Sequence, residues 1–448
     1  MRGTTITGVA AIGFCLQMPI QDPSTILLTV PQRDELRSGA SPAPAGLSAD
    51  GRWVAFESYA RLAPADTNTH RDVYVLDRTT GRVTLESLTS EDQVLTGDSG
   101  YPRLSGDGRY LVFETTVWGT DGTPIGAEIV LRDRVQNTTR RVSRGASDRI
   151  SESSREPAIT EDGRIVAFAS GATDLVAGRD ENGSLEDVYL FEVTTGLVRR
   201  ISVDGHGVQR PDGASFAPSV SADGRYVAFT STATVDGRNA RSSSGRPIAS
   251  VYVRDTQLGV TERVSVCAGG TLPNGGSGDP AITRDGRYVA FVSEAANLVP
   301  GDRNQSADIF LRDLRSRSTV LISRSVSSGT ANGPSGNPVV SADGRVVAFQ
   351  SQASDLLCAR RCPRAVEDIN LLSDVFLFNR VTGLMIRISE GPSGGWPEES
   401  AAPQLDAGGD IIAFTSRHPI ASQDDRNDFD LFVRVRERPG SIPDLTRR

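Results

Sequence analysis

Short segments of alternating apolar and polar residues recur along the whole chain, and one phrase marks each repeat. Its clearest copy is Ser-Ala-Asp-Gly-Arg-Tyr-Val-Ala-Phe at 221–229. Further copies occupy residues 48–56, 105–113, 160–168, 283–291 and 341–349, and a decayed seventh copy occupies 406–414. The copies follow one another at intervals of 55 to 65 residues. A regular period of this length indicates a repeat protein in which each repeat is one supersecondary unit.

Each repeat predicts four short strands, as the fourth copy illustrates. Residues 218–220 form a first strand, and Asp223-Gly224 make a tight turn because glycine adopts positive φ at little cost. Residues 226–231, 250–254 and 261–265 are rich in β-branched and aromatic side chains and form the next three strands. Third and fourth strands of the same kind are predicted at 187–191 and 197–202, 308–311 and 319–323, and 374–378 and 385–389.

Four antiparallel strands repeated seven times predict an all-β fold, a seven-bladed β-propeller. The last repeat contains three clear strands, at 404–406, 410–416 and 430–435. Its fourth strand is weak, because the tail that follows contains Pro439 and Pro443. We expect the apolar run 25–30 to fill this place, so that an N-terminal strand closes the last blade and leaves no open sheet edge. Closure by the C-terminal tail is the alternative.

The repeat phrase, followed by Val251-Tyr252-Val253-Arg254-Asp255, resembles the WD40-like repeats of TolB-type bacterial propellers. The resemblance covers residues 25 to 436. It implies a propeller that is often periplasmic or surface-exposed and that usually serves as a binding scaffold. The same repeat also occurs in translocation proteins and in accessory domains of peptidases, so the resemblance indicates the fold far more strongly than the function.

Composition and the N-terminus change the picture only in part. The net charge is −8, and all 48 basic residues are arginine, without a basic cluster, so binding to nucleic acid through phosphates is disfavoured. The apolar run 6–20 resembles a weak secretory signal and favours a periplasmic, cell-surface or secreted protein, with the cytoplasm as the alternative. No other stretch has the ~20 apolar residues of a membrane span. We therefore expect a leader at 1–24, the propeller at 25–436 and a tail at 437–448. We expect the protein to be a monomer.

The long, irregular segments are predicted to gather on one face of the propeller, opposite the Asp-Gly-Arg turns. They lie at 118–127, 234–250, 267–279 and 353–373. Variable loops on a rigid scaffold are where recognition usually takes place. Cys358 and Cys362 lie in the last of these loops and are close enough in sequence to form a disulfide, with free thiols as the alternative.

Four of the loops between the second and third strands carry another pattern, Asp-x-Asn followed by an aspartate at the start of the third strand. The residues are Asp66, Asn68 and Asp72; Asp180, Asn182 and Asp187; Asp302, Asn304 and Asp308; and Asp425, Asn427 and Asp430. Oxygen ligands at alternate positions, followed by a later carboxylate, suit calcium. The pattern lacks the bidentate glutamate of helix-loop-helix calcium sites. Asx turns, in which the side chains bond to loop amides, explain the same residues without a metal.

No residue is assigned a catalytic role. The Asp-Gly-Arg triplet recurs in six repeats and is interpreted as scaffold, with its arginine pairing with an acid, for example on the adjacent blade. Gly391 to Gly395 match the nucleophile-elbow pattern of hydrolases, but they lie in a connector between blades and not in a strand-to-helix turn. His70 and His418 fall in the first and last blades, which closure would make neighbours.

The leading hypothesis is a non-enzymatic scaffold that binds a protein or glycan partner through its variable loops, with calcium as a stabilising ligand. The alternative is a hydrolase or lyase with its active site at the axial funnel. An enzyme would bring acids, histidines or arginines together at the axis from positions that are not equivalent between repeats. A scaffold would have a bland funnel.

Overall fold

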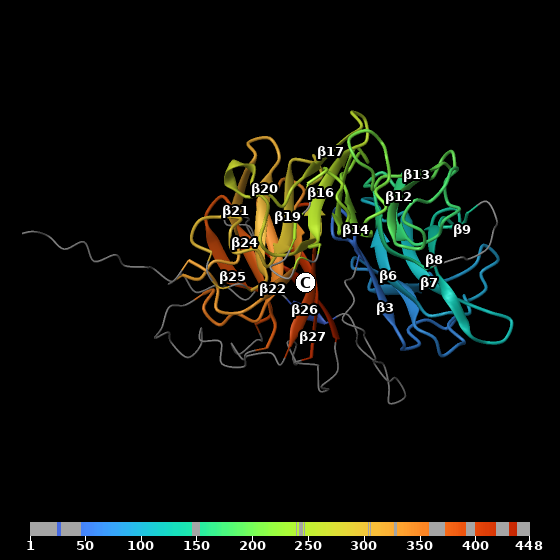
Figure 1. The fold of residues 1–448 in the computed structure, drawn as a ribbon. Coiled ribbons are helices and arrows are strands. Elements are labelled where there is room, and N and C mark those ends of the chain that lie inside the picture. The colour runs from blue at the N-terminus through green and yellow to red at the C-terminus, as the bar shows by residue number, and fades with distance from the viewer. Residues whose placement is uncertain are drawn as a thin grey trace, which may run out of the picture.

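The computed structural model describes residues 25–27, 46–145, 153–238, 240–241, 245, 247–302, 304, 306–326, 329–357, 372–390, 399–417 and 430–436. These residues form seven four-stranded antiparallel sheets, and the only helical element among them is the single turn η1 (Ala268–Gly270). The sheets are arranged as the blades of a ring, with the blue first blade and the red last blade near each other (Figure 1). The predicted all-β, seven-bladed propeller is confirmed.

The blades follow one another in chain order. Blade one contains β2 (Gly46–Leu47), β3 (Trp53–Ser58), β4 (Asp72–Asp77) and β5 (Arg82–Leu85). Blade two contains β6 (Ser99–Leu104), β7 (Tyr110–Trp118), β8 (Pro124–Asp133) and β9 (Thr138–Arg141). Blade three contains β10 (Ser154–Ile159), β11 (Ile165–Ser170), β12 (Asp187–Glu192) and β13 (Val198–Arg200). Blade four contains β14 (Ser215–Val220), β15 (Tyr226–Ser231), β16 (Ser250–Asp255) and β17 (Val260–Arg263).

The remaining blades include the closing one. Blade five contains β18 (Ser277–Ile282), β19 (Tyr288–Ser293), β20 (Asp308–Asp313) and β21 (Ser318–Leu321). Blade six contains β22 (Ser335–Val340), β23 (Val346–Ser351), β24 (Asp374–Asn379) and β25 (Leu384–Arg387). Blade seven contains β26 (Ser400–Leu405), β27 (Ile411–Ser416), β28 (Asp430–Val435) and β1 (Thr25–Leu27).

The ring closes through the N-terminal strand, as predicted. In blade seven β1 pairs antiparallel with β28, with Thr25 opposite Arg434 and Leu27 opposite Phe432. Blades one and seven also meet directly, because the amide of Ala407 donates to the carbonyl of Ala49 at 3.0 Å. Residues 437–448, on which the alternative closure depends, lie outside the described residues.

The recurring phrase builds the turn between the first two strands of each blade. In blade one, Ser48 Oγ donates to Asp50 Oδ1 at 2.6 Å, and the same oxygen accepts from the Arg52 amide at 3.0 Å. Gly51 takes φ +65°, and a Cβ at this glycine would lie 2.4 Å from Cδ1 of Ile411 in blade seven. The glycine is therefore needed both for the turn and for the close contact with the neighbouring blade.

The arginine of the phrase pairs with an acid, as predicted, but the acid belongs to its own blade. The suggestion that the acid lies on the adjacent blade is wrong. In four blades the guanidinium meets the aspartate that ends the third strand, opposite the first residue of the second strand in register. The four pairs are Arg52–Asp77 at 2.7 Å, Arg109–Asp133 at 2.6 Å, Arg225–Asp255 at 2.8 Å and Arg287–Asp313 at 2.7 Å. Arg164 and Arg345 instead pair with Asp162 and Asp343 of their own turns.

The hydrophobic core lies mainly between successive blades. Six blades stack an aromatic ring of the second strand on one of the third, with centroids 5.7 to 5.9 Å apart, as Phe229 and Tyr252 do in blade four. Val54 and Tyr74 of blade one pack with Leu431 and Val433 of blade seven, so the core continues across the closure. Burial of this apolar surface is the main force that holds the blades together.

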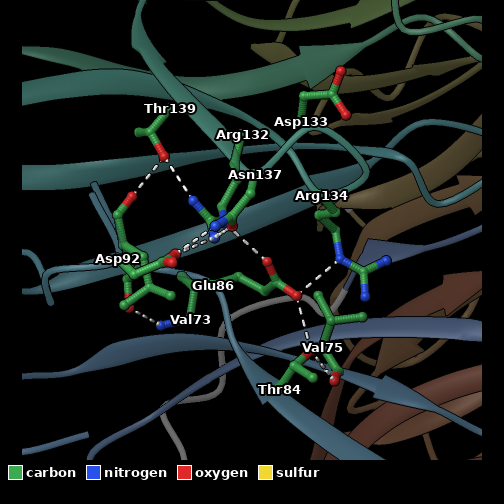
Figure 2. A network of polar contacts seen from close by, with 12 residues as sticks. Val73, Val75, Thr84, Glu86, Asp92, Arg132, Asp133, Arg134, Asn137 and Thr139 are labelled. Atoms are coloured by element: carbon green, nitrogen blue, oxygen red, sulfur yellow. Dashed lines mark hydrogen bonds and ion pairs between the residues drawn. The ribbon is translucent and has the colours of Figure 1, made fainter. Parts of the chain in front are cut away.

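A buried polar network joins blades one and two. Glu86 accepts from Arg132 Nε at 3.1 Å and from Arg134 Nε at 2.9 Å (Figure 2). Arg132 is the next-to-last residue of β8, and Arg134 directly follows the strand. Thr84 Oγ1 donates to the same carboxylate at 2.8 Å. Glu86 is 6% exposed and Arg132 is 3% exposed, so the charges are removed from water together with their partners.

Several predicted boundaries are wrong, including that of the first strand of blade seven, which was expected at 404–406 and is β26. Two others have a clear structural reason. The segment 118–127 was expected to be loop, but β7 and β8 extend into it and leave only a short turn between Trp118 and Pro124. The first strand of blade four begins at Ser215, three residues before the predicted start at 218. The missing residues precede Pro218, which on its own argues against a strand. They belong to the strand through a bulge between Phe216 and Ser219.

Candidate functional site

The bulge in the first strand shapes the inner wall of the ring. Six first strands carry a bulge, and in each the residue before a proline takes positive φ, between 49° and 57°. These residues are Tyr101, Glu156, Ala217, Asp279, Asn337 and Ala402. All six line one cavity of about 300 Å³ at the axis. Positive φ is uncommon outside glycine, so the wall of the cavity is built from a repeated, strained feature.

Oxygen acceptors of one blade bind the bulge amide of the next. Glu57 Oε2 accepts from the amide of Tyr101 at 2.8 Å, and Glu114 Oε1 accepts from that of Glu156 at 2.6 Å. Glu156 Oε2 in turn accepts from the amide of Ala217 at 2.6 Å. Three carboxylates thus connect blades one to four around the cavity.

A neutral side chain makes the same bond on the other side of the ring. Gln350 Oε1 of blade six accepts from the amide of Ala402 in blade seven at 3.1 Å. An amide oxygen is therefore sufficient to hold the bulge. The negative charges of Glu57 and Glu114 are not needed for this structural role.

The carboxylates are not part of the repeat. Glu57 and Glu114 both occupy the fifth position of the second strand, directly after its buried phenylalanine. At this position the other blades carry Ala169, Thr230, Val292, Gln350 and Thr415. Acids thus converge on the axis from two positions of the repeat, the fifth residue of the second strand and the bulge residue of the first, at which most blades carry uncharged residues. The funnel fits neither expectation fully: it is not bland, and its acids occupy repeat-equivalent positions. The sequence analysis did not identify these residues.

Arginines compensate part of the negative charge. Arg71 Nη1 lies 2.8 Å from Glu57 Oε1, and Arg155 pairs with Glu186. Arg103 lines the cavity and donates to the carbonyl of Pro102 at 2.9 Å. Glu156 and Asp279 contribute two more carboxylates to the same region, so acids outnumber guanidinium groups there.

Burial makes these carboxylates hold protons more strongly than usual. It raises the pKa of Glu114 to about 7, and the nearby charges of Glu156 and Glu57 act in the same direction. Burial also raises the pKa of Glu156 and of Asp279 and lowers that of Arg103. A carboxyl group with a pKa near neutrality can exchange a proton under ordinary conditions, and its charge responds to a bound cation.

The predicted calcium residues are largely engaged within the loops. The backbone N–H groups of Asn68 and Asn182 donate to Oδ1 of Asp66 and of Asp180, each at 3.2 Å. This is the Asx-turn arrangement. The last aspartate of each group accepts from a serine that lies two residues after the fourth strand; the pairs are Asp72–Ser87, Asp187–Ser202 and Asp308–Ser323. Asp425 and Asn427 lie outside the described residues, and Asp430 is the first residue of β28.

Within the described part of the chain, three or more His, Cys, Asp or Glu side chains do not converge on one metal-sized point. An ion in these loops would therefore also need amide or backbone oxygens, which calcium accepts. His70 Nδ1 lies 3.3 Å from Asp98 Oδ1, and its ring packs beside Trp118. His418, Cys358 and Cys362 lie outside the described residues.

The fold and the axial cavity define a closed seven-bladed propeller with an acidic pocket on its axis. No family model and no curated protein matches the sequence. Solved structures with the same fold include an oligogalacturonate lyase in complex with manganese, at 13% identity and TM-score 0.51, covering 93% of this chain and 98% of the other. The propeller domain of the Trilobed protease from Pyrococcus furiosus has 10% identity and TM-score 0.53, with coverage of 89% and 95%.

A TolB protein from Acinetobacter baumannii is also similar, with 15% identity, TM-score 0.38, and coverage of 88% of this chain and 86% of that one. At such identities the comparisons establish the propeller fold and leave the function to the site itself. No helix in the described residues is long and apolar enough to cross a membrane.

Proposed function

We propose that this propeller is a binding scaffold whose loops dock a protein partner and whose axial pocket receives a cationic group of that partner. The observation that carries the proposal is the convergence of Glu57, Glu114, Glu156 and Asp279 on the axis. Because Gln350 makes the equivalent backbone bond without a charge, the surplus of negative charge supports a role in binding.

The pocket has the chemistry that an ammonium or guanidinium group prefers. Carboxylates that are partly shielded from water, as Glu114 and Glu156 are, attract a cation more strongly than fully solvated ones, because protein screens charges less than water does. The ring of Tyr101, which is 40% exposed and lines the cavity, adds a surface for a cation–π contact. An arginine, a lysine or an amino terminus of a protein gains from this arrangement, whereas an uncharged glycan does not gain from the excess charge.

Calorimetric titration with benzamidine tests the pocket, and the uncharged benzamide of nearly the same shape is the matched ligand. We expect benzamidine to bind and benzamide to bind at least about tenfold more weakly, as a charge-assisted hydrogen bond requires. The variants Glu156→Gln and Asp279→Asn should each lower the affinity for benzamidine. Glu262→Gln on the outer strand β17, where the side chain is 46% exposed, should not. Equal binding of the two ligands would refute the proposal.

A second candidate function is acid–base catalysis on a neutral substrate. It is favoured by Glu114, whose pKa lies near 7 beside a second carboxylate, Glu156. Two neighbouring carboxyl groups with different pKa values are the usual equipment of glycoside hydrolysis. A polyanion such as an oligogalacturonate is disfavoured here, because the carboxylates would repel it. Turnover of neutral oligosaccharides that disappears in Glu114→Gln and follows a bell-shaped pH profile would favour the enzyme over the scaffold.

We also propose that the protein is exported, on the basis of the apolar run 6–20. Fusing residues 1–24 to a reporter enzyme that is active only outside the cytoplasm tests this directly. Reporter activity is expected for the native segment. Replacing two apolar residues of the run by arginine should abolish it.

A further inference from the structure

One position of the fourth strand decides how the acids beneath each loop are neutralised. This position faces the second residue of the aromatic pair across the sheet, as Arg200 faces Tyr189 and Leu85 faces Tyr74. Blades two, three, four and six carry arginine there, namely Arg141, Arg200, Arg263 and Arg387. In blade two the residue that Arg141 faces is Val130 in place of an aromatic one. Blades one and five carry leucine, namely Leu85 and Leu321.

In blade three the arginine fills the centre of the Asp-x-Asn loop. Arg200 Nη2 donates to Asp180 Oδ2 at 2.6 Å, and its Nε lies 3.3 Å from Asp187 Oδ2. Gln209 Nε2 lies 2.7 Å from Asp180 Oδ1, 2.7 Å from Asn182 Oδ1 and 2.6 Å from Asp187 Oδ2. Side-chain donors of the protein thus satisfy the oxygens that sequence analysis assigned to a metal.

Blade four uses its arginine in the same way, with a different acid. Arg263 Nη2 lies 2.7 Å from Asp236 Oδ1 and donates through Nη1 to Ser250 Oγ at 2.6 Å. In blade six, Arg387 Nη1 lies 3.8 Å from Asp374 Oδ2. A guanidinium beside the start of the third strand is therefore a recurring solution.

Blade one has the acids without the guanidinium. Asp72 is fully buried, and its Oδ2 has no hydrogen-bond partner among the described residues. Asp66 lies near enough for its charge to act on Asp72, and Asn68 stands between them in sequence. Leu85 takes the place of Arg200, and Val94 takes the place of Gln209 in the equivalent bridge. A buried carboxylate oxygen without a donor is costly and calls for a cation or a proton.

Blade five repeats this arrangement. Asp308 is fully buried and Asp302 is 7% exposed. One oxygen of each carboxylate, Oδ2 of Asp308 and Oδ1 of Asp302, lacks a partner among the described residues. The Asn304 side chain donates to the carbonyl of Ala331 at 2.9 Å, which leaves its oxygen facing the loop amide of Ser306. Residues 303 and 305 lie outside the described part of this loop.

We propose that the loops of blades one and five each bind a divalent cation of the calcium type, at the place that the arginine side chain fills in blade three. The ligands are Asp66, Asn68 and Asp72 in blade one, and Asp302, Asn304 and Asp308 in blade five. Two carboxylates and an amide oxygen suit calcium, which completes its shell of six to eight oxygens with backbone carbonyls and water. This inference does not rest on the axial pocket.

Calcium binding to the full-length protein, freed of metal by a chelator, tests the proposal by equilibrium dialysis with calcium chloride. Asp72→Asn and Asp308→Asn should each lower the number of bound calcium ions by one. Asp187→Asn, the matched substitution in blade three, should leave that number unchanged. Calcium should also raise the thermal midpoint of the wild-type protein, because a ligand that binds only the folded state stabilises it.

Supplying the missing guanidinium gives a second test. Leu321→Arg should remove one calcium ion and make blade five resemble blade three, while the protein remains folded by circular dichroism. If this variant does not fold, the two aspartate variants decide the question alone. No bound calcium, or an unchanged number of ions in both Asp72→Asn and Asp308→Asn, would overturn the proposal and leave shared protons as the way in which the acids are neutralised.

Discussion

Gly108 of blade two lies directly against the indole of Trp53 in blade one. A Cβ at this glycine would be 2.2 Å from Cδ1 and 2.6 Å from Cγ of the ring. The ring cannot move away easily, because the guanidinium groups of Arg52 and Arg134 both lie 4.5 Å from its centroid. Blades one and two can thus pack this closely because residue 108 has no side chain.

Gly108→Ala is therefore expected to destabilise the propeller more than a positive φ alone explains. Gly122 also takes positive φ, at 76°, but has nothing within 4 Å of its Cβ position. Gly122→Ala should cost about 1 kcal/mol from backbone strain, and Gly108→Ala should add about 1–3 kcal/mol from overpacking. Urea unfolding measures both values. Equal free energies of unfolding for the two variants would contradict the close contact.

Glu86→Gln tests the network between blades one and two. The substitution leaves Arg132 buried, with its side chain 3% exposed, and removes the charge that faces both Arg132 and Arg134. Breaking a buried ion pair in this way is expected to cost about 3 kcal/mol of unfolding free energy. The control Glu262→Gln changes a half-exposed acid and should cost less than about 0.5 kcal/mol. A small effect of Glu86→Gln would show that water reaches the network.

Glu114 should make stability fall as the pH rises. Its pKa of about 7 in the folded protein exceeds the ordinary value of 4.5, so between these values the folded state binds more protons than the unfolded state. The penalty is absent below about pH 4.5 and complete above about pH 7. The stability of the wild type minus that of Glu114→Gln should therefore decrease across this window in urea titrations. A difference that does not change with pH would contradict the shift. Glutamine keeps an oxygen for the amide of Glu156, as Gln350 does for Ala402.

Deletion of the N-terminal strand should open the ring. A protein that lacks residues 1–30 loses β1 and leaves β28 as a free edge in blade seven. We expect a lower thermal midpoint and concentration-dependent association, since an exposed edge pairs with other chains. A protein that lacks only residues 1–20 retains β1 and serves as the control. Identical melting of the two truncated proteins would argue against the N-terminal closure.

The second and third strands could be predicted closely from sequence, and the first strands could not. Residues 226–231 and 430–435 coincide with β15 and β28, because runs of β-branched and aromatic residues determine them. Six first strands contain a proline as their fourth residue. The bulge at this proline lets the residues before and after it pair with the second strand. A bulge depends on the neighbouring strand, which local sequence does not specify.

The acids of the axial pocket are not apparent from the residues that the repeats share. Glu57 and Glu114 are informative as departures, since the other blades carry uncharged residues at their position. Aligning the copies position by position would have revealed them. The contrast between Arg200 and Leu85 is another departure of this kind, but its meaning needs the distances to Asp180 and Asp187.

The pairing of β1 with β28 also determines when, during synthesis, the ring of blades can close. Thr25 and Arg434 are separated by about 400 positions, so β1 leaves the ribosome long before its partner exists. Six blades can form in sequence before β1 finds its partner, and blade seven is complete only after β28 has been synthesised. A chain whose synthesis stops before residue 430 would therefore form an open propeller with unpaired strand edges, and such edges can pair with other chains.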